Sequence, residues 1–369
     1  MGHFFSFMST NTPSLATDGA ASSKLSLPPV TPLDHRSGLA HTLRQTLAGY
    51  GSTSDTLGRL ESLALQVGLT QHQTQPVLQP LQVLVVAADH GILDEQPIAD
   101  HQVSTAVQVQ RILTGQSPVQ TLAQRLQVPL TLVDAGMTTT ATPSDGGHTR
   151  LLTRKIGFGT RNMARGSAMT GEQTLAALRA GMDVVQHLPG NVLALGVASA
   201  GADIGASIIL SRLCAVSLEE TLPDASRFGS DAAREHLLRT QFDLLRKHRP
   251  VQKPLSLLAA VGGFDLAMLV GAIIQAANER RLILVDGYVS GAAALLAREL
   301  RPAVMDYLVF SHRSGEHRHR LMLIHLQAEP LLDLRLHTED GTAPLLAWPL
   351  VQAAAALLAQ APDHLATLV

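Results

Sequence analysis

The sequence predicts an α/β protein with a parallel sheet, because short apolar runs alternate with longer Ala- and Leu-rich stretches of helical spacing. The short runs are continuously apolar, which is typical of strands buried on both faces by helices. Five such runs lie at residues 83–87, 130–134, 192–195, 282–286 and 307–311. The helical stretches between them include "STAVQVQRILTG", "GEQTLAALRAGMDVVQHL", "FDLAMLVGAIIQAANER" and "GAAALLARELRP".

The two ends of the chain differ from this central region. Residues 1–35 are rich in Ser, Thr, Ala and Pro and predict a disordered N-terminal tail. Residues 36–75 and 336–369 are helical in pattern, with a loop at the start of the second segment and little strand signal. We expect these two ends to pack together as a small helical subdomain beside an α/β domain of residues 76–335.

The composition points to a small-molecule ligand. The formal net charge is -2 and only 3% of the residues are aromatic, so the chain lacks the basic field and stacking surface that bind nucleic acid. No uninterrupted apolar stretch predicts a membrane span, and no secretory signal is evident, so we expect a cytoplasmic protein. Cys214 is the single cysteine and lies in an apolar stretch, which favours a buried, unreactive thiol.

Polar residues follow several of the predicted strands. Asp89 and His90 follow the first, Asp134 ends the second, Asp286 ends the fourth, and His312 follows the fifth. Ligands of open α/β sheets bind outside the carboxyl ends of the strands, so we expect these residues to converge on one cleft. For Asp89 and His90 a second interpretation is equally good, namely a turn closed by the aspartate with a hydrogen-bonded histidine.

Three glycine-containing segments lie before predicted helices. "GFGTRNMARGSAMT" at residues 157–170 suits phosphate binding, although Thr170 and Gln173 also form a helix capping box. "AAVGGFDLAML" places two glycines before Asp265, which could also serve only to complement the helix dipole. "VDGYVSGAAALLA" repeats the strand, turn and helix arrangement.

Two polar segments complete the set. The stretch "SHRSGEHRHRLMLIHL" holds four histidines without the spacing of a helical metal site, so we favour a cleft-lining turn and expect no metal. "LRLHTEDGTAPLLAWP" places Glu339 and Asp340 before a Gly-Thr turn. These two acids form either a surface turn with spare charge or the loop that holds a general base.

Taken in order, these segments resemble a known family. The chain is similar over roughly residues 57–360 to the nicotinate-nucleotide:dimethylbenzimidazole phosphoribosyltransferases of cobalamin nucleotide-loop assembly. The resemblance lies in "LGRLESLALQVG", "VLVVAADHGILDE", "LVDAGM", "GFGTRN…GSAMT", "AAVGGFDLAMLVGAII", "LVDGYVSGAAALLA", "SHRSGE" and "LRLHTEDGTAPLLAWPLVQAA".

The resemblance implies a Rossmann-like parallel sheet flanked by helices, a small helical subdomain formed from both chain ends, and a homodimer. It implies transfer of phosphoribosyl from nicotinate mononucleotide to 5,6-dimethylbenzimidazole or a related base, giving α-ribazole 5'-phosphate and nicotinate. The displacement inverts the anomeric carbon, and a carboxylate removes the proton of the benzimidazole N–H. No cofactor is implied.

The resemblance also implies site residues. Aligning backwards from Pro349 places Asp340 on the catalytic glutamate of the family, and a shift of one residue would place Glu339 there. The substrate-binding residues that it implies are Asp89, His90, Gly159, Thr160, Asn162, Ser199, Gly201, Gly262, Gly263, Asp286, Ser290, His312, Ser314, Gly341 and Thr342.

Two family motifs are degraded, a central segment and the glycine-rich phosphate segment after it, which reads "SRFGSDAAREHLLRT". The central segment reads "LGVASAGADIGAS", in which Ser199 falls on a second family glutamate and Ile204 on an asparagine. These two substitutions would suit a non-catalytic relative that binds a nucleotide or benzimidazole-like ligand as a binding or regulatory subunit. The retained acids at positions 339 and 340 favour the enzyme.

Overall fold

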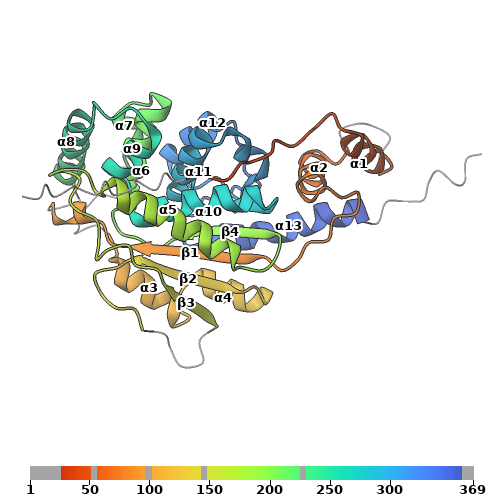
Figure 1. Ribbon diagram of the computed structural model, residues 1–369, viewed down its shortest axis with the longest axis horizontal. Coiled ribbons are helices and arrows are strands. Elements are labelled where there is room, and N and C mark those ends of the chain that lie inside the picture. The colour runs from red at the N-terminus through yellow and green to blue at the C-terminus, as the bar shows by residue number, and fades with distance from the viewer. Residues whose placement is uncertain (1–25, 51–55, 96–101, 143–147, 225–229, 360–369) are drawn as a thin grey trace, which may run out of the picture.

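The computed structural model describes residues 26–50, 56–95, 102–142, 148–224 and 230–359, and its centre is a six-stranded parallel sheet (Figure 1). The strand order β3-β2-β1-β4-β5-β6 is that of a Rossmann-like doubly wound fold, which confirms the predicted fold class. The strands are β1 (Gln82–Ala88), β2 (Leu130–Gly136), β3 (Thr149–Thr153), β4 (Val192–Val197), β5 (Leu282–Val285) and β6 (Leu308–Phe310).

The sequence predicted five of these strands to within two residues at each end and missed β3. That strand lies at the sheet edge, and only Thr149 of its five residues is buried. It therefore lacks the continuous apolar run of the other strands.

Helices cover both faces of the sheet. In Figure 1, α3 and α4 lie below the sheet, and α5, α10 and α11 lie above it. The helices are α1 (Gly38–Ala48), α2 (Arg59–Gln71), α3 (Thr105–Leu113), α4 (Pro118–Leu126), α5 (Gly171–Gln186), α6 (Ala202–Cys214), α7 (Leu218–Thr221), α8 (Asp231–Lys247), α9 (Pro254–Val261), α10 (Phe264–Asn278), α11 (Tyr288–Leu300), α12 (His317–His325) and α13 (Thr342–Ala359).

The pair α5 and α10 packs unusually closely. A Cβ atom at Gly181 of α5 would lie 1.9 Å from the carbonyl oxygen of Met268, and one at Gly271 of α10 would lie 2.1 Å from that of Leu178. Side chains are therefore excluded at both glycines. The contact fixes the start of α10, and with it the loop that precedes this helix.

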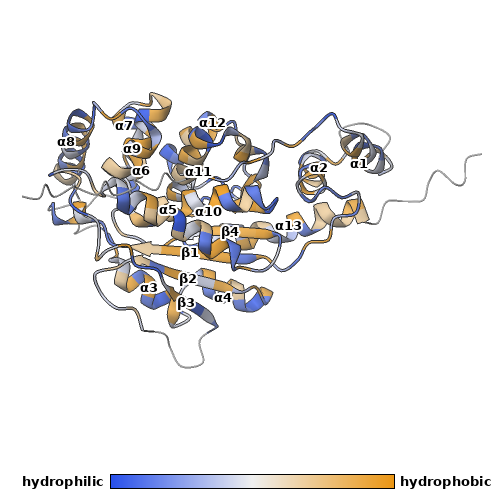
Figure 2. Cartoon of the chain, in the orientation of Figure 1, coloured by the Kyte–Doolittle hydropathy of each residue, from blue (hydrophilic) through white to orange (hydrophobic). Residues whose placement is uncertain are grey.

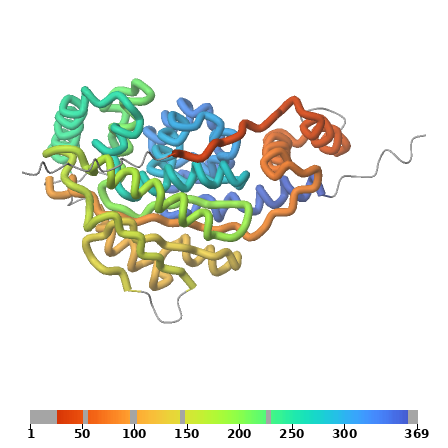
Figure 3. The backbone as a smooth tube through the Cα atoms, viewed as in Figure 1, coloured from red at the N-terminus to blue at the C-terminus, as the bar shows by residue number. Residues whose placement is uncertain are grey.

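Helices α1 and α2 from the start of the chain pack against α13 from its end. In Figures 1 and 3 the red α1 and α2 lie beside the last turns of the blue α13. The hydroxyl of Tyr50 donates to the carbonyl of Leu357 at 2.9 Å. Most of the predicted disordered tail lies outside the described residues. The described part, from residue 26, packs on the protein with Leu27 and Leu33 buried.

Helix α13 has the length and mean hydropathy, 1.5 over 18 residues, of a helix that could cross a membrane. In this protein it is a packed helix, because 56% of that window is buried and it contacts α2, α4 and β4. Figure 2 shows the visible part of α13, to the right of β4, largely in orange.

Cys214, the last residue of α6, is half-buried. Burial raises the pKa of its thiol above the ordinary value. The thiol therefore stays protonated at neutral pH and is a poor nucleophile, in keeping with the predicted unreactive role.

Candidate active site

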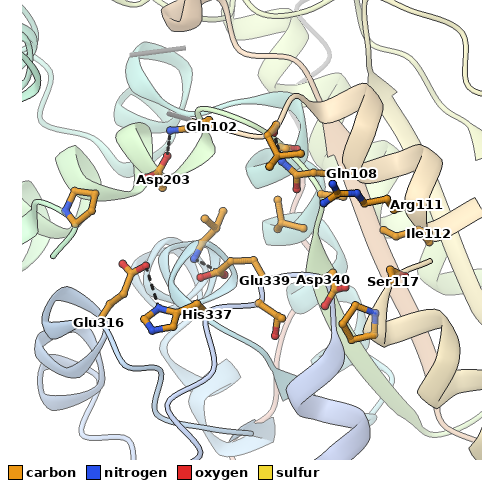
Figure 4. Close-up of a pocket in the computed structure, with 18 of the residues that line it drawn as sticks. Gln102, Gln108, Arg111, Ile112, Ser117, Asp203, Glu316, His337, Glu339 and Asp340 are labelled. Atoms are coloured by element: carbon orange, nitrogen blue, oxygen red, sulfur yellow. Dashed lines mark hydrogen bonds and ion pairs between the residues drawn. The ribbon is translucent and has the colours of Figure 1, made fainter. Parts of the chain in front are cut away.

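A cavity of about 450 Å³ lies beside the carboxyl end of β4, among segments that follow β1 and β4. Strands β1 and β4 are neighbours in the sheet, but the chain continues from β1 to β2 on one side and from β4 to β5 on the other side. The strand order therefore reverses between β1 and β4, and sheets of this kind bind ligands at such a switch point. In Figure 4, Asp203, Glu316 and His337 lie on one side, Gln108, Arg111 and Ser117 on the other, and Glu339 and Asp340 between them.

The two acids sit on a loop pressed against β4. A Cβ atom at Gly196 would lie 2.5 Å from the carbonyl carbon of Asp340, so only glycine allows this approach. The amide of Val197 donates to the carbonyl oxygen of Glu339 at 2.6 Å. Gly341 has a φ of 93°, a conformation that favours glycine.

Glu339 binds the N-terminus of α11. Its Oε1 accepts the amide of Tyr288 at 2.8 Å, and its Oε2 accepts that of Val289 at 3.1 Å. A Cβ atom at Gly287 would lie 2.6 Å from this carboxyl group, so the glycine makes room for it. Burial raises the pKa of Glu339 to about 8, Asp286 adds to the increase, and the two amides oppose it.

Asp340 binds the N-terminus of α13. Its Oδ1 accepts the hydroxyl of Thr342 at 2.6 Å and the amide of the same residue at 3.2 Å. Among the described residues its Oδ2 accepts no hydrogen bond. Burial raises the pKa of Asp340 to about 6, with the Thr342 bonds opposing and Asp286 adding to the shift. Asp340 is therefore mostly ionised at pH 7 and has an oxygen available to take a proton.

Asp286, His312 and Ser290 lie behind this loop instead of lining the cavity. The Oδ2 of Asp286 accepts the amide of Gly341 at 2.7 Å, and its Oδ1 lies 3.3 Å from Nε2 of His312. Ser290 is buried in the first turn of α11. Of these three predicted substrate-binding residues, Asp286 contacts the loop of the acids directly and His312 contacts Asp286.

An ion network that sequence reasoning missed forms one wall of the cavity. Arg318 donates to Glu316, lies 3.2 Å from Oδ2 of Asp203, and stacks 4.4 Å from the ring centre of Tyr288. Burial acts against its charged form, but Asp203 and Glu316 raise the pKa of Arg318 above the ordinary value. In the sequence, Glu316 and Arg318 stand among the histidines of the segment that was considered for metal binding. That position was the only sequence feature that pointed to a functional role for these two residues.

Gln102 joins this network to the start of α6. Its Nε2 donates to Asp203 at 3.1 Å, and its Oε1 accepts the amide of Gly201 at 2.5 Å. Gly201 has a φ of 82° and begins the helix that carries Asp203. Of the predicted substrate-binding residues, Ser199 alone lines the cavity.

Asp89 and His90 prove to be turn residues, and neither lines the cavity. Oδ2 of Asp89 accepts the amide and the hydroxyl of Thr138, both at 2.7 Å. His90 forms a fully buried ion pair with Asp265 at 2.9 Å. Despite burial, this pairing raises the pKa of His90 and lowers that of Asp265. The expected convergence of all strand ends on one cleft is thus wrong for Asp89 and His90.

Asp134, which was also expected at the common cleft, does not line the cavity. It pairs with Lys155 at 2.9 Å and accepts the amides of Gly136 and Met137. Its carboxylate therefore closes the end of β2.

The glycine-rich segment at residues 157–170 also bonds to neighbouring parts of the protein. The hydroxyl of Thr160 accepts the amide of Gly91 at 3.1 Å, and Nδ2 of Asn162 donates to Glu95 at 2.7 Å. The Thr170 and Gln173 capping box is present at the start of α5. The predicted residues of this segment that do not line the cavity are Gly159, Thr160 and Asn162.

The remaining predicted residues lie apart from the cavity. A Cβ atom at Gly263 would lie 2.3 Å from the ring of His90, and one at Gly262 would lie 2.6 Å from Leu258, so both glycines serve packing. Ser314 lines a second cavity of about 300 Å³, beside Arg313, Arg320 and Arg335. In the described part of the chain, no three His, Cys, Asp or Glu side chains are grouped to hold a metal ion.

The fold and this site define an α/β protein of the nucleotide-binding type, with two acids at the switch point of its sheet. A family model described as "Phosphoribosyltransferase" matches residues 31–365. The nicotinate-nucleotide–dimethylbenzimidazole phosphoribosyltransferase of Variovorax paradoxus is 40% identical over 88% of this chain and 91% of its own. That of Cupriavidus taiwanensis is 37% identical over 90% and 95%. The chain therefore belongs to the nicotinate-nucleotide–dimethylbenzimidazole phosphoribosyltransferase family.

Solved structures agree with this membership. The crystal structure of CobT from Thermus thermophilus superimposes with a TM-score of 0.79 at 29% identity, covering 87% of this chain and 96% of that one. A second structure from the same organism gives a TM-score of 0.77 at 28% identity, covering 86% and 95%.

Proposed function

We propose that this chain transfers phosphoribosyl from nicotinate mononucleotide to 5,6-dimethylbenzimidazole or a related base. A ring nitrogen of the benzimidazole attacks the anomeric carbon with its lone pair. The bond to the nicotinate nitrogen breaks, and its electron pair returns to the pyridine ring. The proton of the other benzimidazole nitrogen passes to a carboxylate of the protein, so charge and atoms balance.

The observation that carries this proposal is Asp340, which lines the cavity and has one carboxylate oxygen that accepts no hydrogen bond from the described residues. A general base must be ionised at the working pH and must have an acceptor facing the substrate. Asp340 meets both conditions, since its pKa is about 6 and its Oδ2 accepts no bond from the described residues. Family membership supplies the reaction to which this base belongs.

Glu339 has a different role in this proposal. Both of its oxygens accept amides of α11, and its pKa of about 8 keeps it mostly protonated at pH 7. It therefore anchors the loop and leaves proton removal to its neighbour. This assignment keeps Asp340 as the base, as the alignment from Pro349 had placed it.

The relatives and the acids of the site favour the enzyme over the non-catalytic alternative, although Ser199 replaces a family glutamate in the cavity wall. The Ser199 hydroxyl accepts the amide of Ala88 at 2.9 Å and also bonds to Asp265, so it contributes to the cavity wall. Although a carboxylate is missing at this position, Glu316 and Asp203 bring carboxylates to the same cavity. Relatives named for the enzyme at 37–40% identity support the catalytic function.

We also propose that the protein works in the cytoplasm as a homodimer, with two small molecules as its partners and without nucleic acid, membrane or cofactor. The family resemblance supports the dimer, and the formal net charge of -2 supports the lack of a polyanionic partner. Light scattering after size-exclusion chromatography measures the assembly. A monomeric mass would contradict the dimer.

The activity is tested with the full chain, nicotinate mononucleotide and dimethylbenzimidazole, with chromatographic detection of nicotinate and α-ribazole 5'-phosphate. We expect the two products to appear in equal amounts and only when both substrates are present. Parallel reactions with benzimidazole and adenine identify the base that is accepted. Absence of nicotinate release with every base would rule out the proposed function.

A further inference from the structure

Behind the acid pair lies a group of buried polar side chains that does not reach the cavity. Asp286, Ser290, Ser311, His312 and His319 are all completely buried near the carboxyl ends of β5 and β6. Buried polar groups are costly unless they bond to one another. Among the described residues, no hydrogen-bond partner is found for Oδ1 of Asp286, for either ring nitrogen of His312, or for the hydroxyls of Ser290 and Ser311. Buried polar atoms left without a hydrogen bond indicate a role beyond packing.

Asp286 joins this buried group to the acids. One oxygen, Oδ2, accepts the amide of Gly341 at 2.7 Å, immediately after Asp340. The other, Oδ1, faces Nε2 of His312 at 3.3 Å, and both side chains are fully buried. The carboxylate thus has the catalytic loop on one side and a histidine on the other.

The backbone around His312 is held firmly. Residue 312 forms a parallel bridge with Leu332. The amide of Ser311 donates to the carbonyl of Val285 at 3.0 Å, and the amide of Leu332 donates to the carbonyl of Ser311 at 3.0 Å. The imidazole therefore projects from a rigid support, as a group that positions another must.

We propose that His312 is a positioning residue for the reaction: its Nε2, 3.3 Å from Oδ1 of Asp286, fixes this carboxylate by a close polar contact, and Asp286 in turn holds Gly341 and the acid pair in place. This inference rests on the proposed function for its catalytic consequence. His312 touches neither the cavity nor the reacting atoms.

The surroundings of His312 leave Asp286 as the group that faces its Nε2. The titratable groups that face it are Asp286 from the end of β5 and His319 from α12, whose ring centre is 5.6 Å away. Nδ1 of His319 accepts the amide of Ser314 at 3.2 Å, and burial, His312 and Arg318 lower its pKa to about 3. His319 is therefore neutral, which leaves Asp286 as the charged group that faces Nε2 of His312.

Loss of the His312 imidazole has two consequences. Burial raises the pKa of Asp286, and His312 opposes that increase, so without the histidine Asp286 takes up a proton more readily. A protonated Asp286 holds the Gly341 amide less well. It also no longer raises the pKa values of Glu339 and Asp340 through its charge.

The test compares His312→Leu, His312→Gln and the control His248→Leu in the full-length protein. His248 is also a buried histidine, bonded through Nε2 to the carbonyl of Met163 at 2.9 Å, outside the cavity lining. We expect His312→Leu to lower kcat about tenfold or more, with a small change in KM, because the base is displaced. Its activity should also extend to lower pH, since the pKa of Asp340 falls.

Two further results are expected. Amide hydrogen exchange in residues 336–345 should speed up in His312→Leu and stay near wild type in the control. His312→Gln should regain most of the activity, because its amide can donate to Asp286 from a similar distance.

Wild-type kcat, pH profile and loop exchange in His312→Leu would overturn the proposal, and so would equal effects in His248→Leu. If His312→Leu does not fold, His312→Asn replaces it, since the shorter amide stops short of Asp286 and should behave in the same way. If the wild-type chain releases no nicotinate, the proposed function fails separately. In that case, unchanged loop exchange in the His312 variants still decides against positioning, and faster exchange supports it.

Discussion

Glu339 and Asp340 are neighbours in the chain, yet their carboxyl groups bind the N-termini of two different helices. Glu339 accepts the first two amides of α11, and Asp340 accepts the amide and hydroxyl of Thr342 at the start of α13. Burial raises both pKa values, to about 8 for Glu339 and about 6 for Asp340. Two acids whose surroundings separate their pKa values in this way are suited to different tasks.

The first prediction assigns the base. Asp340→Asn should lower kcat/KM by about 10²–10⁴-fold, the usual contribution of a general base. Glu339→Gln should cost less, about tenfold, because glutamine keeps one of the two bonds to α11 and leaves Asp340 in the cavity. Steady-state assays of nicotinate release measure both. A larger loss in Glu339→Gln than in Asp340→Asn would reverse the assignment.

The second prediction concerns the pH dependence of kcat/KM in the wild-type chain. Asp340 accepts a proton only when ionised, so activity should rise with pH through its pKa of about 6 and then level off. If Glu339 were the base, the same rise would be centred near its pKa of about 8. A profile from pH 5 to 9 at constant ionic strength separates the two. A midpoint near 8 contradicts Asp340.

The fold could be predicted from the sequence because its strands carry a strong local signal. A parallel strand that is buried on both faces must be apolar throughout, and five of the six strands are read from that rule. The edge strand Thr149–Thr153 is partly exposed and has no such run. The helices at the two chain ends followed from the helical pattern of those segments.

The site was predictable only where the signal is local. Glu339 and Asp340 lie in one short turn, so their pattern was visible in the sequence. His90 was ambiguous because a polar residue after a strand can face a ligand or close a turn. Its partner Asp265 lies 175 residues away in the sequence, so only the folded structure shows that His90 forms a buried pair instead of facing a ligand. Arg318 and Asp203 were missed for the same reason, being 115 residues apart.

The third prediction tests the close contact between the acid loop and β4. Gly196→Ala would place a methyl group 2.5 Å from the carbonyl carbon of Asp340, so the loop must move away. A displacement of about 1 Å at the base should lower kcat by roughly a hundredfold. Gly171→Ala is the matched control, because its Cβ meets no atom within 4 Å. Equal activity of the two variants, both folded by circular dichroism, would show that the loop tolerates the methyl group.

The fourth prediction concerns the buried pair of His90 and Asp265. We expect Asp265→Ala to lower the free energy of unfolding by about 3–5 kcal/mol, because it leaves a buried histidine without its partner. Denaturant unfolding at pH 7 measures this change. Asp243→Ala serves as the control, since Asp243 forms an exposed pair with Arg246 that should contribute less than about 1 kcal/mol. Similar effects in the two variants would argue against a structural role for the buried pair.

The last prediction follows from the raised pKa of Glu339. Its pKa is about 8 in the folded protein against an ordinary value of 4.5, so the folded state keeps a proton that the unfolded chain has lost. The resulting stabilisation is complete below pH 4.5 and disappears as the pH rises through 8. Glutamine does not titrate, so the unfolding free energy of the wild type minus that of Glu339→Gln should decrease with pH across this window.

The decrease should exceed about 1 kcal/mol, because one pKa unit corresponds to about 1.4 kcal/mol. Denaturant unfolding at pH 5, 6, 7 and 8 gives the difference directly. Glu219→Gln, at an exposed position of α7, is the control and should show a much flatter difference. A difference for Glu339→Gln that stays constant or increases with pH would mean that Glu339 is ionised on the N-terminus of α11. The assignment of Asp340 as the sole base would then lose its electrostatic support.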